Sequence, residues 1–478
     1  MTHLLAITFV EILVSLPYII IAIIALGVVV FAHEWGHFMV GRRMGIRAEA
    51  FSIGFGPILW RKQVGETEYR LSLILFGGYV KFSGMEGTED KTPQEIERGF
   101  FAAPPGRRIL AAFSGPFMNV VLAFALFFVL WGTGRKTPEH QVTTVIGALE
   151  KDSPAEKAGL KPGDRIVSIS GRGVDRWMDV LMGVAVGGKT LDIEIERDGS
   201  TMHVTVAPTE DPKAGAQKMG VGPAQRAIVF RVERGSEAER MGLRKDDLLL
   251  RLDDEPILSG SPGWQEKLQE RAGQQITIAV ERAGEPVTLT GTMPTGTEDQ
   301  PPMLGLVMVP LYVTIYENPL EATAYSFDIV GRTLKALVTR RVKAKGLSGP
   351  VGIVGLITYS LRVHFTSFLW WAAFISLNLA VINLLPIPVV DGGHIMFSVI
   401  EKIRRKPVKE KTMAVLTNVF AVLLIAFALY VTFNDVKRLI PSKDEKEKKP
   451  AAEETVPDES PPEQHGNEDA DPEATAPQ

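Results

Sequence analysis

A pair of histidines four positions apart is the first pattern in this chain that could do chemistry. Residues 33–37 read HEWGH. On an α-helix, residues i and i+4 share a face, so His33 and His37 can offer two imidazole nitrogens to one metal ion. A glutamate beside the first histidine is typical of zinc hydrolases, in which it takes a proton from metal-bound water. The pattern therefore predicts a zinc site with Glu34 as its general base.

This motif stands at the end of an apolar segment. Residues 14–32 carry no charge, and a run of about 19 apolar residues is long enough to cross the hydrocarbon of a bilayer. Ionisable side chains at that depth are expensive without partners, so they are candidates for function by default. We therefore interpret the motif as functional, although five residues can also match by chance.

A second segment supplies candidates for a further ligand. A catalytic zinc usually has three protein ligands and one open position, and NLLPIPVVDGG at 383–393 ends another apolar stretch. Its prolines end a helix and free backbone groups there. Asp391 and the nearby His394 are both possible ligands, and the Pro-Gly pattern alone does not rank them. An ordinary helix exit with an exposed aspartate is the alternative.

Four regions are predicted to carry transmembrane helices. They are 1–66, which includes a cytoplasmic loop, then 107–132, 366–391 and 412–434. Each contains about 20 predominantly apolar residues, as a span requires. The first run is too long for a cleavable signal peptide, and Glu11 rather than a basic cluster precedes it.

Basic residues near the span ends predict the orientation. Basic residues follow the first span, precede the second and fill the loop between the last two. All of them lie in the cytoplasm if both termini lie outside it. They are Arg42, Arg43, Arg47, Arg107, Arg108, Lys402, Arg404, Arg405, Lys406, Lys409 and Lys411. The zinc site then lies near the cytoplasmic face, and residues 135–310 are extracytoplasmic. Lys437 and Arg438 argue weakly for the opposite orientation.

Composition excludes some classes. The net charge is −4 over 478 residues, so there is no charge signature of nucleic-acid binding. Cysteine is absent, which removes disulfides and thiolate zinc ligands. The tail at 441–478 is rich in Pro, Glu, Asp, Lys and Ala, cannot bury a core and should be disordered.

Two further segments are predicted to lie at the membrane. Residues 67–86 read as a β-hairpin around Gly77-Gly78. It is either cytoplasmic or dips into the membrane beside the active site, where extended backbone must pack on protein or line a wet cavity. Residues 315–365 combine amphipathic helical spacing with a glycine-rich apolar stretch, which predicts a segment on the outer membrane surface.

The soluble middle contains an internal repeat, 153–171 and 236–254. Each copy reads as a short helix ended by glycine, a turn and an apolar strand. The matched pairs are Ser153/Ser236, Ala155/Ala238, Glu156/Glu239, Gly159/Gly242, Leu160/Leu243 and Asp164/Asp247. The repeated segment resembles PDZ domains of bacterial proteases and predicts such domains at 138–212 and 220–310. PDZ domains bind extended peptides at a sheet edge; a spacer or steric filter is the alternative.

Three separated motifs together resemble the site-2 protease family of intramembrane zinc metalloproteases. They are HEWGH, SGPFMN at 114–119 and NLLPIPVVDGG. FSIGFGPILW at 51–60, GGYVKF at 77–82, the tandem repeat and LSGP at 347–350 resemble its bacterial branch with two PDZ domains. The resemblance covers nearly the whole chain up to about residue 440. Val390 replaces the branch's usual leucine, a conservative change.

The resemblance implies a metal set and a reaction. His33, His37 and Asp391 would hold one Zn²⁺ per chain, which favours Asp391 over His394. Glu34 would act as general base and then as the acid that protonates the leaving amine.

It also implies substrate contacts. Asn383 would donate a hydrogen bond to the substrate backbone or to the developing oxyanion. Asn119 would bind substrate backbone, or else serve as a packing contact between helices. Gly77, Gly78 and Tyr79 belong to the predicted hairpin, which resembles the family's membrane-reentrant element and would offer an edge to a substrate strand.

The expected fold is a multi-pass α-helical membrane protein with four transmembrane helices, a membrane-associated β-hairpin and two extracytoplasmic PDZ-like α/β domains. The resemblance implies a bacterial inner-membrane enzyme that cuts single-span proteins, such as anti-sigma factors or remnant signal peptides, after an upstream site-1-type protease. The PDZ pair would exclude intact substrates or read trimmed ends. A metal transporter would not need Glu34, and a noncatalytic PDZ scaffold would not need the intact HEWGH motif and Asp391.

Overall fold

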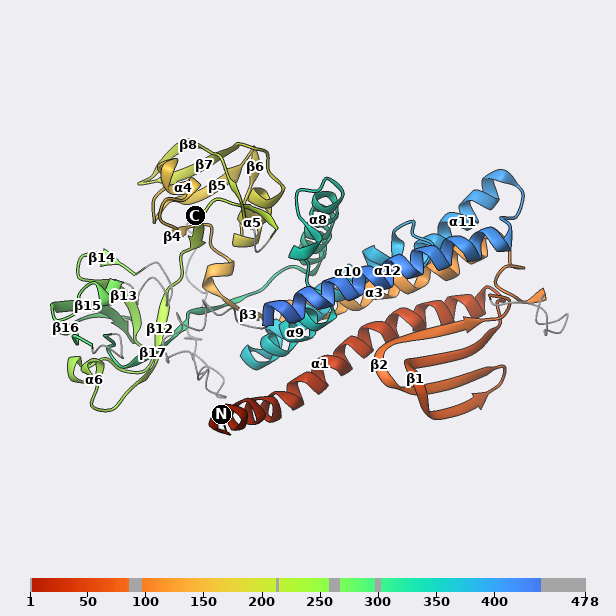
Figure 1. Ribbon diagram of the computed structural model, residues 1–478, viewed down its shortest axis with the longest axis horizontal. Coiled ribbons are helices and arrows are strands. Elements are labelled where there is room, and N and C mark those ends of the chain that lie inside the picture. Colours follow the sequence, from red (N-terminus) through yellow and green to blue (C-terminus); the bar gives the residue numbers. More distant parts are fainter. Residues whose placement is uncertain (1, 86–96, 212–214, 258–266, 297–301, 440–478) are drawn as a thin grey trace, which may run out of the picture.

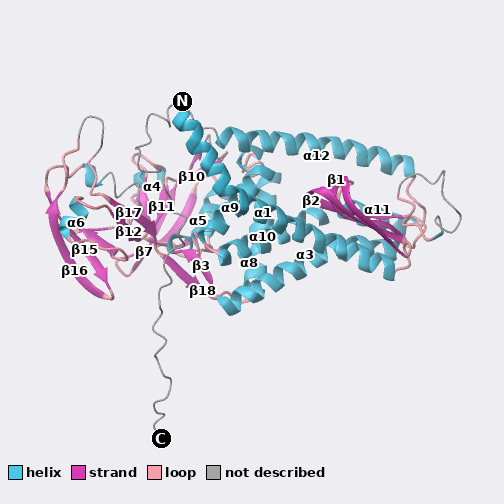
Figure 2. Cartoon of the chain, turned by 90° about the horizontal axis from the view of Figure 1, so that it is seen from below, coloured by secondary structure: helices cyan, strands magenta, loops and turns pink. Residues whose placement is uncertain are grey.

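The computed structural model describes residues 2–85, 97–211, 215–257, 267–296 and 302–439. The predicted disordered tail at 441–478 lies outside them. Within the described residues, long helices run through one part of the molecule and two strand-rich units lie at one end of it (Figure 1). A separate pair of long strands lies beside the helices, away from these units (Figure 2).

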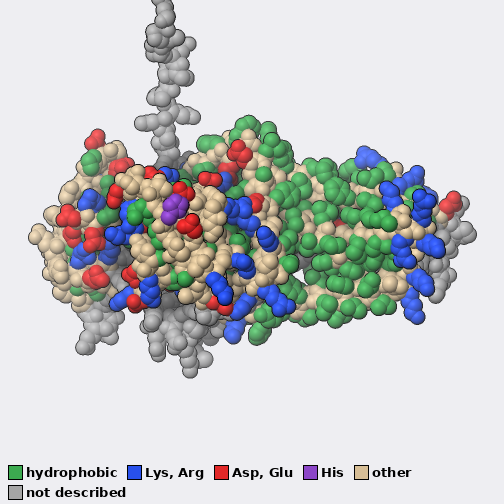
Figure 3. Space-filling model, turned by 90° about the horizontal axis from the view of Figure 1, so that it is seen from above, with side chains coloured by type: hydrophobic (Ala, Val, Ile, Leu, Met, Phe, Trp, Pro, Cys, Tyr) green, Lys and Arg blue, Asp and Glu red, His purple; other side chains and the backbone are tan. Residues whose placement is uncertain are grey.

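Four helices are long and apolar enough to cross a membrane. The apolar stretches are Ser15–Arg43, Pro105–Thr133, Phe365–Leu384 and Lys411–Lys437. They belong to α1 (Thr2–Arg43), α3 (Pro105–Thr133), α10 (Phe365–Leu384) and α12 (Glu410–Leu439). Hydrophobic side chains form a broad band over this part of the surface, and Lys and Arg side chains gather at its far end (Figure 3). The chain is therefore a membrane protein.

The third span ends earlier than the predicted residue 391. Helix α10 stops at Leu384 and a new helix, α11 (Asp391–Arg404), begins at Asp391. Pro386 and Pro388 lie in the irregular segment between them and cannot donate backbone hydrogen bonds. A Cβ on Gly392 would collide with the Leu385 carbonyl oxygen. This turn therefore places Asp391 in the first turn of a helix instead of at the end of a span.

The predicted hairpin over 67–86 is wrong in its bounds. Strand β1 (Ala48–Val64) pairs with β2 (Thr67–Phe82), so 67–82 is one strand of a larger hairpin, and residue 86 lies outside the described part of the chain. The first half of β1 lies between the two halves of β2, because Phe51 pairs with both Val80 and Tyr69. Large apolar side chains are exposed on the hairpin: Phe55, Ile58, Leu59, Trp60, Leu73 and Ile74.

The predicted surface segment at 315–365 is two helices that pack on the spans. These are α8 (Pro319–Val338) and α9 (Pro350–Val363), with a short η2 (Ala344–Gly346) between them. Ile357 of α9 is buried with Ala22 of α1 and Phe368 of α10. Glycines allow this close packing, since the Gly352 backbone N–H reaches Oδ2 of the buried Asp435 on α12 at 2.8 Å.

The first strand-rich unit is longer than the predicted 138–212. Strand β11 pairs with β4, and Met219 belongs to the unit's buried core, so residues up to Pro223 complete it. Its elements are η1 (Glu139–Gln141), β4 (Ile146–Leu149), α4 (Pro154–Lys157), β5 (Arg165–Ile169), β6 (Arg172–Gly173), α5 (Trp177–Val186), β7 (Leu191–Arg197), β8 (Ser200–Val206), β9 (Thr209–Asp211), β10 (Ala216–Lys218) and β11 (Val221–Pro223).

The second unit has its own core and one main sheet. The sheet order is β16-β15-β13-β12-β17, with β14 beside β13. Its elements are β12 (Ala227–Val232), α6 (Glu237–Met241), β13 (Leu248–Leu252), β14 (Glu255–Pro256), β15 (Gln275–Arg282), β16 (Glu285–Thr292) and β17 (Leu306–Pro310).

The two units repeat the same local contacts. The hydroxyls of Ser153 and Ser236 cap their helices by accepting from backbone N–H groups 3.2 Å away. Buried Asp164 receives Arg197 Nε at 2.6 Å, and buried Asp247 receives Arg282 Nε at 2.7 Å. The sequence repeat is therefore a repeat of structure.

A two-stranded ribbon joins the units to the spans. Strand β3 (Arg135–Pro138) leaves α3 and pairs with β18 (Tyr312–Ile315), which leads to α8. Ion pairs also tie the first unit to α8: Arg172 with Asp328 at 2.8 Å, and Arg332 with Asp179 at 2.9 Å. Both units therefore lie at one end of the helices, with α8 beside the first (Figure 1).

Candidate active site

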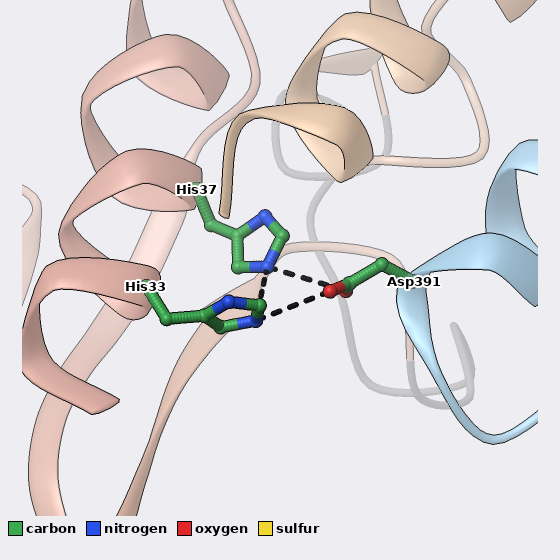
Figure 4. A group of neighbouring side chains, drawn as sticks. All are labelled: His33, His37 and Asp391. Atoms are coloured by element: carbon green, nitrogen blue, oxygen red, sulfur yellow. Dashed lines mark hydrogen bonds and ion pairs between the residues drawn. The ribbon is translucent and has the colours of Figure 1, made fainter. Parts of the chain in front are cut away.

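Two histidines of α1 and the first residue of α11 face one another (Figure 4). His33 Nε2 and His37 Nε2 lie 3.1 Å apart. Asp391 Oδ2 lies 3.1 Å from His33 Nε2, and Asp391 Oδ1 lies 3.2 Å from His37 Nε2. The structure thus brings together the three predicted ligands, and within the described residues they are the group with metal-ligand geometry.

This arrangement fits a metal ion. Ligand atoms about 3.3 Å apart are what a tetrahedral zinc with bonds of 2.0–2.1 Å requires. Asp391 Oδ2 is buried without a hydrogen-bond partner although an imidazole nitrogen is close by. Both histidines are less than a tenth exposed. Two imidazoles and a carboxylate also form a donor set that catalytic zinc commonly uses.

The ring of His37 is held from behind. Its Nδ1 lies 2.8 Å from the Ala111 carbonyl oxygen on α3. A carbonyl only accepts, so Nδ1 carries the hydrogen and the lone pair of Nε2 faces His33 and Asp391. A Cβ on Gly115 would collide with this imidazole, and one on Gly36 would collide with the Ser114 carbonyl oxygen. Glycine at both positions lets α1 and α3 approach closely enough to place the ring.

Asn119, predicted either to bind substrate backbone or to pack between helices, is enclosed by other parts of the protein. Its side chain is fully buried, and its Nδ2 lies 3.2 Å from His33 Nδ1. Its Oδ1 is buried without a hydrogen-bond partner, and its carbonyl accepts from Ser376 Oγ of α10 at 2.9 Å. Asn119 therefore contacts a histidine and a neighbouring helix.

Glu34 and Asn383 lie beside the three ligands. Glu34 lines a cavity of about 160 Å³ together with both histidines and Asp391. Asn383, near the end of α10, has its Nδ2 3.3 Å from His33 Nε2. A carboxylate and an amide donor therefore both lie beside the ligand group.

Strand β2 forms another wall of this cavity. Tyr79 and Val80 line it, and the Val80 backbone hydrogen-bonds Glu34. A Cβ on Gly78 would lie 2.7 Å from the Ser52 carbonyl oxygen and 3.2 Å from Glu34 Cγ, so glycine allows β2 to approach α1. Gly77 instead faces Phe55, whose ring a Cβ would hit. The Tyr79 hydroxyl accepts from Arg70 at 2.9 Å.

The rival ligand His394 lies in the same cavity but outside the ligand group. Its ring packs against Phe100, with ring centroids 5.5 Å apart. Burial lowers the pKa of His394 below its ordinary value, so the imidazole stays neutral at neutral pH. His394 thus lines the cavity and packs against an aromatic ring, one turn along α11 from Asp391.

Sequence reasoning missed the residues that position the ligands. The Ala111 carbonyl leaves no signal in a sequence, because every residue has one. Gly115 stands inside the SGPFMN segment of an apolar span, and its small size was the available sign of a close helix contact.

Comparisons with known proteins identify the family. The chain matches the model of peptidase family M50 over residues 21–427. It is similar to "Regulator of sigma-E protease RseP" of Escherichia coli K12, with 30% identity over 447 residues that cover 87% of this chain and 98% of that protein. "Putative zinc metalloprotease" of Vibrio cholerae is 30% identical over 452 residues, with the same coverage.

Solved structures that are similar to part of the chain include a bacterial PDZ domain. It is the PDZ domain of an SdrC-like protein from Listeria monocytogenes, with 18% identity and a TM-score of 0.16, covering 17% of this chain and 85% of that one.

Proposed function

The chain belongs to peptidase family M50 and is a site-2-type metalloprotease, and from this premise we propose that it cuts single-span membrane proteins within the membrane. The observation that carries the proposal is the meeting of His33, His37 and Asp391 on helices at membrane depth, with Glu34 beside them. A hydrolytic site in such apolar surroundings suits substrates that are themselves membrane segments.

One zinc ion per chain would be held by His33, His37 and Asp391. When bound, it would supply a Lewis acid and lower the pKa of a water molecule. Glu34 accepts a proton from the attacking water at its carboxylate and returns it to the leaving amine nitrogen. Asn383 Nδ2 donates to the carbonyl oxygen of the substrate as negative charge develops there.

Strand β2 would align the substrate. Peptide bonds in a helix are shielded by their own hydrogen bonds, so a transmembrane segment must open before it can be cut. Within the described residues, the part of β2 from Gly78 to Phe82 is paired with β1 alone, and Val80 in this part contacts Glu34. A substrate strand added along this edge would present its backbone to Glu34. The exposed apolar side chains of the hairpin support a location within the membrane.

Asn119 is proposed to position His33. Which amide atom is oxygen is an assignment made from surroundings, and Oδ1 lacks a partner while Nδ2 faces His33 Nδ1. With the amide turned over, Oδ1 accepts from His33 Nδ1–H, which leaves the lone pair of Nε2 for the metal. The Ala111 carbonyl does the same for His37.

Replacing Asn119 should therefore weaken zinc binding. Asn119→Leu keeps the volume but offers no acceptor, and loss of such a partner lowers metal affinity about 10–100-fold. Asn119→Asp keeps an acceptor and should stay near wild type. Chelator competition in a Glu34→Gln background measures affinity without proteolysis. Asn378→Leu is the matched control, because that amide donates to its own helix at Phe374. Wild-type affinity in Asn119→Leu would show that the residue only packs.

Substrate choice is proposed to reside in the two repeat units. The similar proteins carry names that refer to regulation of sigma-E, so membrane-bound anti-sigma factors are the proposed substrates, trimmed first by another protease.

The basic residues at the end of the helices opposite the units (Figure 3) support a cytoplasmic location for that end, with units and termini outside, in a bacterial inner membrane. As PDZ-like modules, the units would exclude bulky ectodomains or read trimmed ends.

The function and the filter can be tested together. Residues 140–310 are replaced by a short Gly-Ser linker, which the ribbon permits because Pro138 and Tyr312 are paired neighbours. Intact and shortened enzymes are each given a trimmed single-span stub and the full-length substrate with its folded ectodomain. We expect the intact enzyme to cut only the stub and the shortened enzyme to cut both. Versions with Glu34→Gln should cut neither.

Each outcome has a distinct meaning. If the intact enzyme leaves a trimmed membrane stub uncut but hydrolyses a soluble unfolded protein, the proposed substrate class is wrong. If the shortened enzyme keeps its zinc and cuts the stub but still rejects the full-length substrate, the units are docking sites or spacers and not a steric filter.

A further inference from the structure

A cavity of about 570 Å³ lies at the end of the molecule away from the repeat units. The chain just before α3, the end of α11 and the first turn of α12 enclose it. It is separate from the metal site and the proposed mechanism does not use it. Its lining residues are Phe101, Ala102, Ala103, Pro104, Pro105, Arg108, Glu401, Lys402, Arg405, Lys406, Pro407, Val408 and Met413.

The charge in this cavity is strongly positive. Four basic side chains line it, and Glu401 is its single acid. Both oxygens of Glu401 are engaged, because Arg108 pairs with Oε2 and the Val408 backbone N–H donates to Oε1 at 2.9 Å. Within the described part of the chain, Lys402, Arg405 and Lys406 form no ion pair. The cavity therefore lacks an anion of its own to balance them.

Two details indicate that the positive charge is built in. Arg108 is only 4% exposed, and its Nε is buried without a hydrogen-bond partner. Arg405 ends α11 with a φ of 54°, a left-handed conformation in which glycine or asparagine is favoured. An arginine where the backbone favours glycine, next to a buried guanidinium with a free donor, points to an anionic ligand.

Location and lining identify the kind of anion. Arg108 and Met413 lie in the first turns of two membrane-spanning helices, so the cavity sits where hydrocarbon meets water. About half of its wall is apolar, and α3 and α12 leave it with exposed side chains such as Leu110 and Val415. Figure 3 shows Lys and Arg side chains gathered beside the hydrophobic band at this end.

We propose that this cavity binds the phosphate headgroup of an anionic phospholipid, whose acyl chains run along α3 and α12. Basic pockets between membrane helices on the cytoplasmic side are suited to such headgroups. The ligand would also steady the catalytic site. Helix α11 begins at Asp391 and ends at Arg404, next to the cavity, so a bound headgroup would hold the far end of the helix that carries this ligand residue.

Lipid titration of the purified full-length protein tests the proposal. Native mass spectrometry would compare phosphatidylglycerol with phosphatidylcholine of the same acyl chains, and sn-glycerol 3-phosphate as a soluble headgroup. Each basic residue near an anionic lipid contributes about fivefold in affinity. The double variant Arg405→Gln/Lys406→Gln should therefore bind phosphatidylglycerol about 25-fold more weakly and phosphatidylcholine unchanged. Arg404→Gln/Lys409→Gln is the matched control, because these two residues flank Arg405 and Lys406 in the sequence but do not line the cavity.

A single substitution separates binding from folding. Arg405→Gly removes the charge but relieves the left-handed backbone, so thermal stability should be kept or raised while lipid affinity falls about fivefold. If the control and cavity variants lost the same affinity for phosphatidylglycerol, general surface charge would explain the binding and the proposal would be overturned. So would equal affinity of the intact protein for sn-glycerol 3-phosphate and the lipid, which would assign the cavity to soluble anions.

Discussion

Glu34→Gln should abolish most cleavage and leave the metal in place. The amide keeps the shape of the side chain but cannot accept a proton, and general acid–base groups commonly contribute about 10²–10⁴-fold to the rate. The carboxylate shares a cavity with the three metal ligands without belonging to them. Cleavage of a trimmed single-span substrate in proteoliposomes gives the rate, and inductively coupled plasma mass spectrometry gives the zinc content.

The control for this experiment makes the same chemical change elsewhere. The control is Glu66→Gln. Glu66 lies in the turn between β1 and β2, where its side chain is exposed and pairs with Arg98. This variant should cut at the wild-type rate. If Glu34→Gln cuts within a few-fold of wild type while carrying a full complement of zinc, the proton is moved by another group.

Asp391→Ala should remove the zinc itself. Losing only a partner behind a ligand lowers metal affinity about 10–100-fold, so loss of a ligand should exceed about 100-fold. The expected zinc content after dialysis falls from about one per chain to nearly none, and cleavage falls with it. His33→Ala should behave in the same way, because both residues supply an atom to one group.

His394→Ala tests the rival assignment. This imidazole lines the same cavity but lies outside the ligand group. The variant should keep its zinc even if packing against Phe100 is weakened. If Asp391→Ala kept its zinc and His394→Ala lost it, His394 would be the metal ligand and Asp391 would only line the cavity.

The ligand set could be predicted because its signals are local. The spacing of His33 and His37 places them on one helix face whatever the rest of the fold does. A same-side apolar segment with a proline-glycine turn offered both Asp391 and His394, and the family resemblance was needed to favour Asp391. The structure adds how the turn works: α10 ends and a new helix starts at the aspartate itself.

The hairpin and Asn119 depended on contacts that local patterns do not contain. Gly54, Gly56 and Pro57 gave the region before 67 the look of a loop, although it is the strand β1. Two roles for Asn119, binding substrate backbone and packing between helices, stayed open because its position on α3 does not show which neighbour its side chain meets. Only packing shows that this neighbour is His33.

The second repeat copy illustrates a milder version of the same limit. Asp246 stands where the first copy has Gly163, so this position is absent from the matched pairs of the repeat. Both residues adopt a left-handed turn, with φ of 71° and 95°. Aspartate is among the non-glycine residues that tolerate this conformation, so the turn survived a substitution that obscured it in the sequence.

The metal ligands come from opposite ends of the described chain, and this has a consequence for biosynthesis. His33 and His37 enter the membrane with the first span, whereas Asp391 follows the third. Ribosomes add about 5–20 residues per second, so the histidines wait tens of seconds for their partner. If these residues hold the metal, a nascent chain stays inert while it shares the insertion machinery with other unfinished membrane proteins, and it becomes active only after its third span has been made.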